Sequence, residues 1–128
     1  MHLAVKIAVV ALGGALGALG RTGGTALVAS LSGLSEHGRI LGTMAVNIVG
    51  CFGMGVLKAA SEVHHWGSAE VNAFLISGML GAFTTFSTFE ENSVSLWRGG
   101  QEWLAAGYMG GSVLGGLLAF LIGWALIE

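Results

Sequence analysis

The sequence predicts an all-α integral membrane protein with four transmembrane helices. Hydrophobic residues make up 54% of the 128 positions and charged residues only 9%. Water-soluble domains carry about 25% charged residues, so a chain this apolar belongs in lipid. A helix needs about 20 predominantly apolar residues to cross a bilayer. The predicted spans cover residues 4–29, 40–58, 72–96 and 104–126, in a single membrane domain over residues 1–128.

The first span contains two cationic residues. Lys6 followed by the apolar run Ile7–Leu12 has features of a secretory signal peptide. However, the apolar character continues past Arg21 and three more spans follow, so we interpret this segment as a membrane helix. Arg21 could lie near the interface, where its long side chain reaches water. The alternative is a vestibule role in which it gathers anions.

The second span carries one amide side chain, that of Asn47. An Asn within lipid commonly bonds to a neighbouring helix. Alternatively, its NH₂ group donates to a passing anion. Cys51 lies in the same span and is the chain's one cysteine, so no intrachain disulfide is expected.

The third span departs most from a plain apolar helix. Hydroxyl groups and phenyl rings alternate over residues 78–89, and Thr84 lies at the centre of the span. Glycine weakens a helix, and hydroxyls offer alternative backbone hydrogen bonds. A local break would expose carbonyl oxygens such as those of Gly81 and Thr84, which suit a hard cation such as Na⁺. From the residues alone we favour the alternative, a continuous helix whose hydroxyls bond to the preceding turn.

Two phenylalanines in this span share one helix face. Phe86 and Phe89 lie three residues apart, a stripe that is commonly core packing or lipid contact. An aromatic ring also has a positive edge, so edges that face a narrow passage would attract an anion. Ser87 and Thr88 lie beside these rings and would add hydroxyl donors.

The fourth span places two hydroxyls on one face, from Tyr108 and Ser112 at i and i+4. They form either a polar track for an ion or cross-links between helices. Glycines recur every four residues in this span and in the first, which lets helix backbones approach closely in lipid. These glycines are Gly13, Gly17, Gly20, Gly24, Gly107, Gly111 and Gly115.

Lysine and arginine give almost no bias between the two orientations of the chain. Lys6 and Lys58 belong to one side of the membrane, and Arg21, Arg39 and Arg98 belong to the other. An excess of these residues in cytoplasmic loops normally sets the orientation. The chain could therefore insert both ways up and pair as an antiparallel dimer. A single orientation, set by other factors, is an equal alternative.

Three motifs in order resemble the Fluc-type fluoride channels, also called the CrcB family, over nearly the full chain. The first is the glycine-rich segment Gly13–Gly17 leading to Arg21. The second is Gly42–Asn47, which is similar to the family's Gly-Thr-x-x-Val-Asn motif. The third, Thr84–Phe89, matches the family's Thr-Thr-Phe-Ser-Thr-Phe signature at every position and is the most specific of the three.

The resemblance implies a dual-topology antiparallel homodimer in a prokaryotic plasma or inner membrane. Its two pores would conduct fluoride passively and selectively, which relieves fluoride toxicity. Asn47 would donate to fluoride, and Phe86 and Phe89 would line the pores with ring edges. Tyr108 and Ser112 would continue the polar track on the fourth helix.

The resemblance also implies a structural, untransported Na⁺ at the dimer axis, held by the carbonyls of Gly81 and Thr84 from both subunits. This implies a third helix that is broken near its centre. The chain departs from the family at three places. Ala82 stands where members often have Gly, Asn92 where many have Glu, and Gly116 where some have Ser.

Other function classes fit the sequence less well than a channel. A coupled transporter of the small multidrug-resistance type needs an acid in its first span, and residues 1–30 contain no Asp or Glu. A scaffold subunit of a membrane complex would use its polar residues for helix contacts and would conduct no ion. An enzyme is disfavoured because no nucleophile–base pair is visible, and no motif indicates a nucleic-acid partner.

Overall fold

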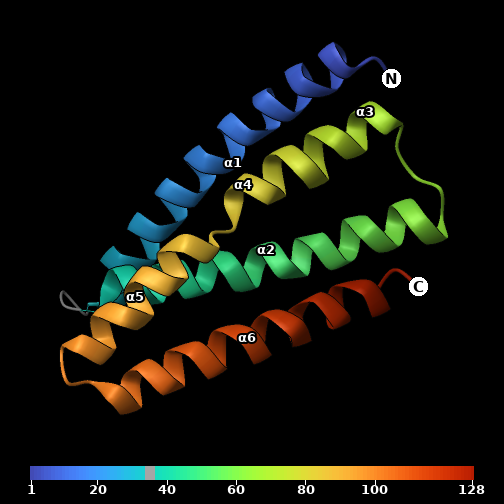
Figure 1. Ribbon diagram of the computed structural model, residues 1–128. Coiled ribbons are helices and arrows are strands. Elements are labelled where there is room, and N and C mark those ends of the chain that lie inside the picture. The colour runs from blue at the N-terminus through green and yellow to red at the C-terminus, as the bar shows by residue number, and fades with distance from the viewer. Residues whose placement is uncertain (34–36) are drawn as a thin grey trace.

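In the computed structural model, which describes residues 1–33 and 37–128, the chain folds into a set of helices (Figure 1). The first two spans are α1 (Leu3–Ser32) and α2 (Gly38–Val63). The third is built from α3 (Ala69–Asn72), η1 (Ala73–Leu80), α4 (Gly81–Phe83) and α5 (Phe86–Arg98), and the fourth is α6 (Glu102–Ala125).

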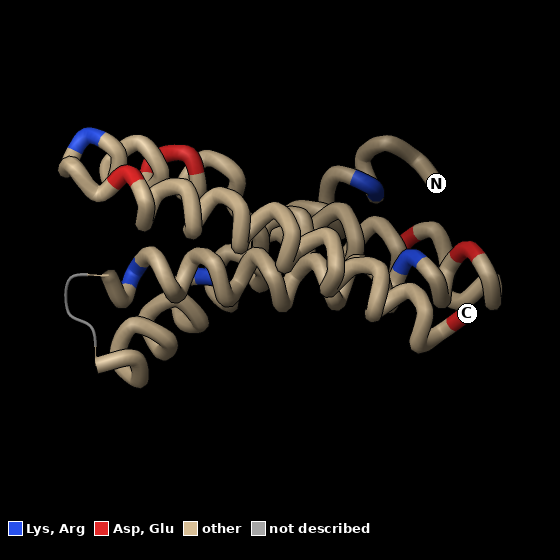
Figure 2. Tube along the Cα trace, turned by 90° about the horizontal axis from the view of Figure 1, so that it is seen from below, with Lys and Arg blue, Asp and Glu red and all other residues tan. Residues whose placement is uncertain are grey.

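The prediction of an all-helical membrane protein is confirmed. Within the described residues there is no strand, and four helices are long and apolar enough to cross a membrane. The first three predicted spans lie inside these helices, and the fourth ends just past Ala125. Lys, Arg, Asp and Glu lie toward the two ends of the bundle, and its middle is free of them (Figure 2). This arrangement matches a bilayer with charged groups at both surfaces.

The helices run up and down, and both termini lie at the same end of the molecule (Figure 1). α1 packs mainly against η1, and α2 packs mainly against α6. α5 begins after the break, and it contacts α6 and the first half of α2 (Figure 1). The third span therefore joins the two helix pairs.

Small residues bring α1 and the third span into backbone contact. A Cβ atom at Gly13 would collide with the carbonyl oxygen of Phe74, and one at Gly17 would collide with that of Met79. The same closeness joins α2 to α6, where Gly55 faces the Phe120 carbonyl. The predicted close contact along the fourth span does not extend to Gly107, because nothing lies within 4 Å of its Cβ position.

The third span is interrupted at its centre. Thr84 has φ −82° and ψ 156°, and Thr85 has φ −146° and ψ 114°, both in the extended region. The continuous helix that the residues alone favoured is therefore wrong. The preceding segment, η1, is a π-helix, which the sequence pattern did not predict. π-Helical turns are rare in proteins, and those that do occur are frequently found at functional sites.

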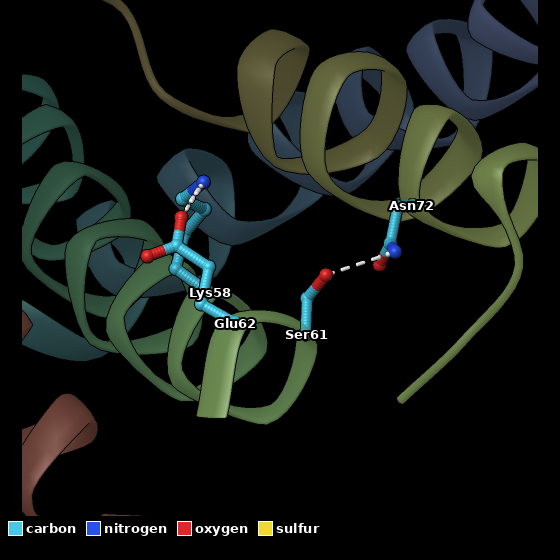
Figure 3. A network of polar contacts seen from close by, with 4 residues as sticks. All are labelled: Lys58, Ser61, Glu62 and Asn72. Atoms are coloured by element: carbon cyan, nitrogen blue, oxygen red, sulfur yellow. Dashed lines mark hydrogen bonds and ion pairs between the residues drawn. The ribbon is translucent and has the colours of Figure 1, made fainter. Parts of the chain in front are cut away.

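Polar contacts also fix the end of the bundle where α2 turns into α3 (Figure 3). Lys58 and Glu62 form an ion pair one turn apart on α2. The Asn72 amide donates to the Ser61 hydroxyl over 2.9 Å, which ties the start of the third span to the end of α2. His64 contacts the Ile127 carbonyl at 2.7 Å and holds the C-terminal turn beside the same loop.

Candidate functional site

The break in the third span is held open by a side chain from α2. The Thr85 N–H donates to Asn47 Oδ1 over 2.7 Å, and Asn47 Nδ2 donates to the Thr85 carbonyl over 3.1 Å. One amide therefore satisfies both main-chain polar groups of an extended residue inside lipid, where an unpaired group would be costly. The Asn47 NH₂ group has two hydrogens, and this pairing uses one of them.

The same contacts release the carbonyls that the sequence singled out. In a continuous helix the Thr85 N–H would donate to the Gly81 carbonyl, four residues earlier. It donates to Asn47 instead. Likewise, the Thr88 N–H would donate to the Thr84 carbonyl but donates to the Thr85 hydroxyl at 3.3 Å. Gly81 is exposed and Thr84 is half-buried. Main-chain oxygens freed in this way are suitable ligands for a hard cation.

Hydroxyl groups collect where α5 begins. Thr85 caps the helix, and its hydroxyl donates to the Thr88 hydroxyl over 3.0 Å. The Ser87 hydroxyl lies 3.5 Å from the same Thr85 oxygen. The first N–H groups of a helix carry partial positive charge. The break therefore gathers neutral donors and a positive helix end without any formally charged side chain.

An open pocket of about 280 Å³ lies against the break. Its lining combines the polar groups of Asn47, Thr84, Thr85 and Ser112 with apolar side chains. The apolar part of the lining includes Gly50, Cys51, Met54, Phe86, Phe89, Val113 and Phe120. The Ser112 hydroxyl oxygen is buried and has no hydrogen-bond partner within the described structure. A buried hydroxyl without a partner is uncommon and calls for a ligand or water.

Three aromatic rings follow one another from the pocket towards the interior of the subunit. The ring centroids of Phe86 and Phe89 lie 5.7 Å apart, and those of Phe89 and Tyr108 lie 5.5 Å apart. Both pairs are tilted by 37°, so the rings do not stack face to face. Phe86 is 74% exposed, whereas Phe89 is 8% and Tyr108 4% exposed. The Tyr108 hydroxyl accepts a hydrogen bond from Asn92 Nδ2 over 3.2 Å.

The sequence also matches a known protein family. Residues 8–124 match the family described as CrcB-like protein, Camphor Resistance (CrcB). The chain belongs to the CrcB family. The family assigned from the three sequence motifs is therefore confirmed, as is a multi-pass membrane location.

Several curated members of the CrcB family are similar to this chain over most of their length. The fluoride-specific ion channel FluC of Paracoccus denitrificans is 46% identical over 114 residues, covering 89% of this chain and 87% of the relative. That of Chloroflexus aurantiacus is 42% identical over 121 residues, covering 94% of both chains. That of Stutzerimonas stutzeri is 44% identical over 117 residues, covering 91% and 92%.

Within this CrcB fold, the predicted site residues fall into two groups. Asn47, Thr84, Phe86, Phe89 and Ser112 line one pocket. The others do not line it. Ser87 and Thr88 join the hydroxyl cluster beside Thr85, Gly81 lies one turn before the break, and Tyr108 lies behind Phe89. Arg21 is half-buried on α1, away from the pocket lining.

Two residues of the site were not assigned a role from the sequence. Thr85 caps α5, and its N–H donates to the Asn47 side-chain oxygen. Its signal was a Thr directly before the first residue of a polar helix, because Thr is one of the residue types preferred at an N-cap. Asn92 bonds to Tyr108. Its position three residues after Phe89 places both on one helix face, and that spacing was visible in the sequence.

Proposed function

We propose that this protein is a fluoride-selective passive channel that exports fluoride from the cytoplasm across a bacterial inner membrane and relieves fluoride toxicity. The observation that carries the proposal is the pocket at the break, where neutral donors converge in an apolar setting. Curated relatives that cover most of the chain are named fluoride-specific ion channels. The protein would act as a channel and not as an enzyme.

Fluoride is small and strongly hydrated, so a selective pore must offer close donors in a narrow passage. The second N–H of the Asn47 amide and the unpartnered Ser112 hydroxyl are such donors, and both residues line the pocket. A fixed positive charge would hold the ion too tightly for conduction, because an ion must leave as readily as it enters. Uncharged donors avoid that trap.

The phenylalanine rings would supply the remaining attraction. Phe86 and Phe89 both line the pocket and are tilted relative to each other. Ring edges carry partial positive charge and ring faces partial negative charge. Edges turned towards the passage would favour an anion and disfavour a cation. Behind them, Tyr108 and Ser112 lie one turn apart on α6 and would continue the path.

The assembly would be an antiparallel homodimer of dual topology. Lys6 and Lys58 belong to one side of the fold, near the start of α1 and towards the end of α2. Arg21, Arg39 and Arg98 belong to the other side, in the second half of α1, at the start of α2 and at the end of α5. This near balance permits both orientations in the membrane. Phe86 is 74% exposed in the single subunit although it lines the pocket. A second subunit against this surface would enclose the pocket and complete the pore wall.

A structural Na⁺ would bind at the break, through the carbonyls of Gly81 and Thr84. The residues fit this role because their usual helical donors are directed elsewhere, to Asn47 and to the Thr85 hydroxyl. Gly81 is exposed on the single subunit, which suits an ion shared between two copies. When bound, the cation would stabilise the unpaired main-chain oxygens of the break. Arg21 would gather anions at a vestibule.

The alternatives are less well supported. A coupled multidrug transporter would need an acid within the first span, and α1 contains neither Asp nor Glu. A scaffold subunit would not require a pocket that combines a buried unpartnered hydroxyl with a main-chain break. The partners of the channel are therefore fluoride, the surrounding lipid and a second copy of the chain.

The direct test is ion efflux from liposomes that contain the purified protein, followed with fluoride and chloride electrodes in the presence of Na⁺. A selective uncoupled channel releases fluoride rapidly and chloride not at all, and release depends on an ionophore that balances charge. Fluoride release that requires a proton gradient would indicate a coupled transporter. A well-folded dimer that releases no fluoride would favour a scaffold or an obligate pairing with a homologous chain.

A further inference from the structure

Asn92 is the one polar side chain bonded to the hydroxyl of Tyr108 within the described residues. Its Nδ2 donates to that hydroxyl over 3.2 Å. The Tyr108 ring is 4% exposed and packs in an apolar cluster with Phe89, Leu96 and Ala105. A phenolic oxygen in such surroundings depends on the few partners within its reach.

The direction of this hydrogen bond matters for an anion. A phenol has one O–H donor and an oxygen that accepts. An amide nitrogen only donates, so its bond to Tyr108 occupies the accepting oxygen and leaves the O–H hydrogen unused. A carboxylate at the same position would accept instead and would take up that hydrogen. An amide at position 92 therefore preserves a hydroxyl donor on α6.

The position of Asn92 and Tyr108 suits a contact with fluoride beyond the pocket. Phe89 lines the pocket, and Tyr108 lies directly behind its ring with 5.5 Å between centroids. Ser112, which also lines the pocket, follows Tyr108 by one turn of α6. Neither member of the pair is charged, and the adjacent carboxylates of Glu90 and Glu91 belong to exposed residues.

We propose that Asn92 is a positioning residue that acts through Tyr108: by donating to the phenolic oxygen, it keeps the Tyr108 O–H free to donate to the permeating anion. The inference rests on the proposed fluoride channel and adds to it a specific task for Asn92. The amide holds the hydroxyl in a donor orientation, and the hydroxyl makes the contact with fluoride.

A spectroscopic experiment tests the direction of the bond without any flux measurement. Tyr108 is the chain's single tyrosine, so the intensity ratio of the tyrosine Raman doublet reports on it alone. This ratio distinguishes a phenolic oxygen that accepts hydrogen bonds from a hydroxyl that mainly donates. The parent protein should give the accepting signature, and Asn92→Leu should lose it. A parent protein with a purely donating signature, or an unchanged signature in Asn92→Leu, would overturn the inference.

The fluoride dependence of efflux tests the function of the pair. Asn92→Leu and Tyr108→Phe should each raise the half-saturating fluoride concentration about fivefold, the effect of one typical hydrogen bond. The double variant should be no worse than either single variant, because both remove the same donor. Asn92→Gln, which keeps the amide, should restore part of the affinity. Additive effects of the two substitutions would overturn the inference.

A matched control comes from the opposite end of the third span. Asn72 donates to Ser61 and is not part of the pocket lining. Asn72→Leu should lower thermal stability and leave the half-saturating concentration unchanged. Equal shifts in Asn72→Leu and Asn92→Leu would reveal a general packing effect and overturn the inference. If the parent protein conducts no fluoride, the proposed function fails, whereas parent flux with an unchanged Asn92→Leu response refutes this inference alone.

Discussion

Asn47 on α2 takes over the hydrogen bond that Thr85 would otherwise make with the Gly81 carbonyl. The amide accepts from the Thr85 N–H at 2.7 Å and donates to the Thr85 carbonyl at 3.1 Å. A side chain thereby substitutes for a turn of helix at the depth of the membrane where main-chain groups must be paired. Asn47 thus pairs both main-chain groups at the break and also lines the pocket beside it.

Replacing Asn47 should therefore affect both folding and conduction. Asn47→Leu leaves two main-chain groups of Thr85 without partners, which should lower stability by about 2 kcal/mol and abolish fluoride flux. Asn47→Asp keeps an acceptor for the Thr85 N–H but loses the donor and adds negative charge. It should assemble and block anions. Thermal unfolding in detergent and liposome efflux measure the two effects, and normal conduction by Asn47→Asp would count against an amide donor.

Phe86 should matter for conduction and little for stability of the subunit. Its side chain is 74% exposed in the single chain, so Phe86→Ile should change stability by no more than roughly 0.5 kcal/mol. Fluoride flux should fall sharply because the ring edge is lost. Phe52→Ile, a ring outside the pocket lining, provides the control. Unchanged efflux from an assembled Phe86→Ile dimer would remove this ring from the pore.

Replacing Ser112 should also reduce conduction without lowering stability. Its buried hydroxyl has no partner in the described structure, so Ser112→Ala should leave stability unchanged or raise it by up to ~1 kcal/mol. Flux should fall severalfold. Ser93 is the matched control, because its buried hydroxyl donates to the Phe89 carbonyl at 2.7 Å. Ser93→Ala should lower stability by about 1 kcal/mol. A large stability loss in Ser112→Ala would show that its hydroxyl has a structural partner.

Two glycines of α1 should be far less tolerant of substitution than one of α6. A Cβ at Gly13 or Gly17 would collide with the main chain of η1, and overpacking of this kind costs about 1–3 kcal/mol. Gly107 has open space around its Cβ position, so Gly107→Ala should be neutral or stabilising by up to ~1 kcal/mol. Chemical denaturation of the three variants compares them. Equal tolerance at all three positions would contradict the backbone contact between α1 and η1.

Sodium removal tests the carbonyl site. Replacing Na⁺ with a large organic cation should lower the unfolding temperature of the purified protein and reduce fluoride flux, because the proposed site at the Gly81 and Thr84 carbonyls would lose its cation. Titrating Na⁺ back should restore both properties with one half-maximal concentration. Flux and unfolding temperature that are indifferent to Na⁺ would rule out a structural ion at the break.

The spans were predictable from the sequence because bilayer thickness fixes the length of an apolar helix. The break was not predictable from the span itself. Local residues such as Gly81 and Thr84 allow both a continuous and an interrupted helix, and the group that decides between them lies on α2. Asn47 is 38 residues from Thr85 in the chain. Only the resemblance to the family carried that information, since its second motif ends at Asn47 and its third begins at Thr84.

The glycine contacts and the pairing of Asn92 with Tyr108 were also only partly predictable from the sequence. A spacing of four residues identified the glycines of α1 as contact positions, and the structure confirms Gly13 and Gly17. The same spacing did not reveal that Gly107 faces open space, because spacing gives a helix face and not its neighbour. Asn92 and Tyr108 meet across two helices, so their pairing required the tertiary structure.

The shared end of the two termini (Figure 1) constrains how two copies could be joined genetically. An even number of crossings returns the chain to the side where it started. A second copy fused directly behind the first would begin on that same side and insert in the same orientation. A single-chain version of an antiparallel pair would therefore need a linker that crosses the membrane once more, of about 20 apolar residues. A flexible soluble linker of any length could not reverse the second copy.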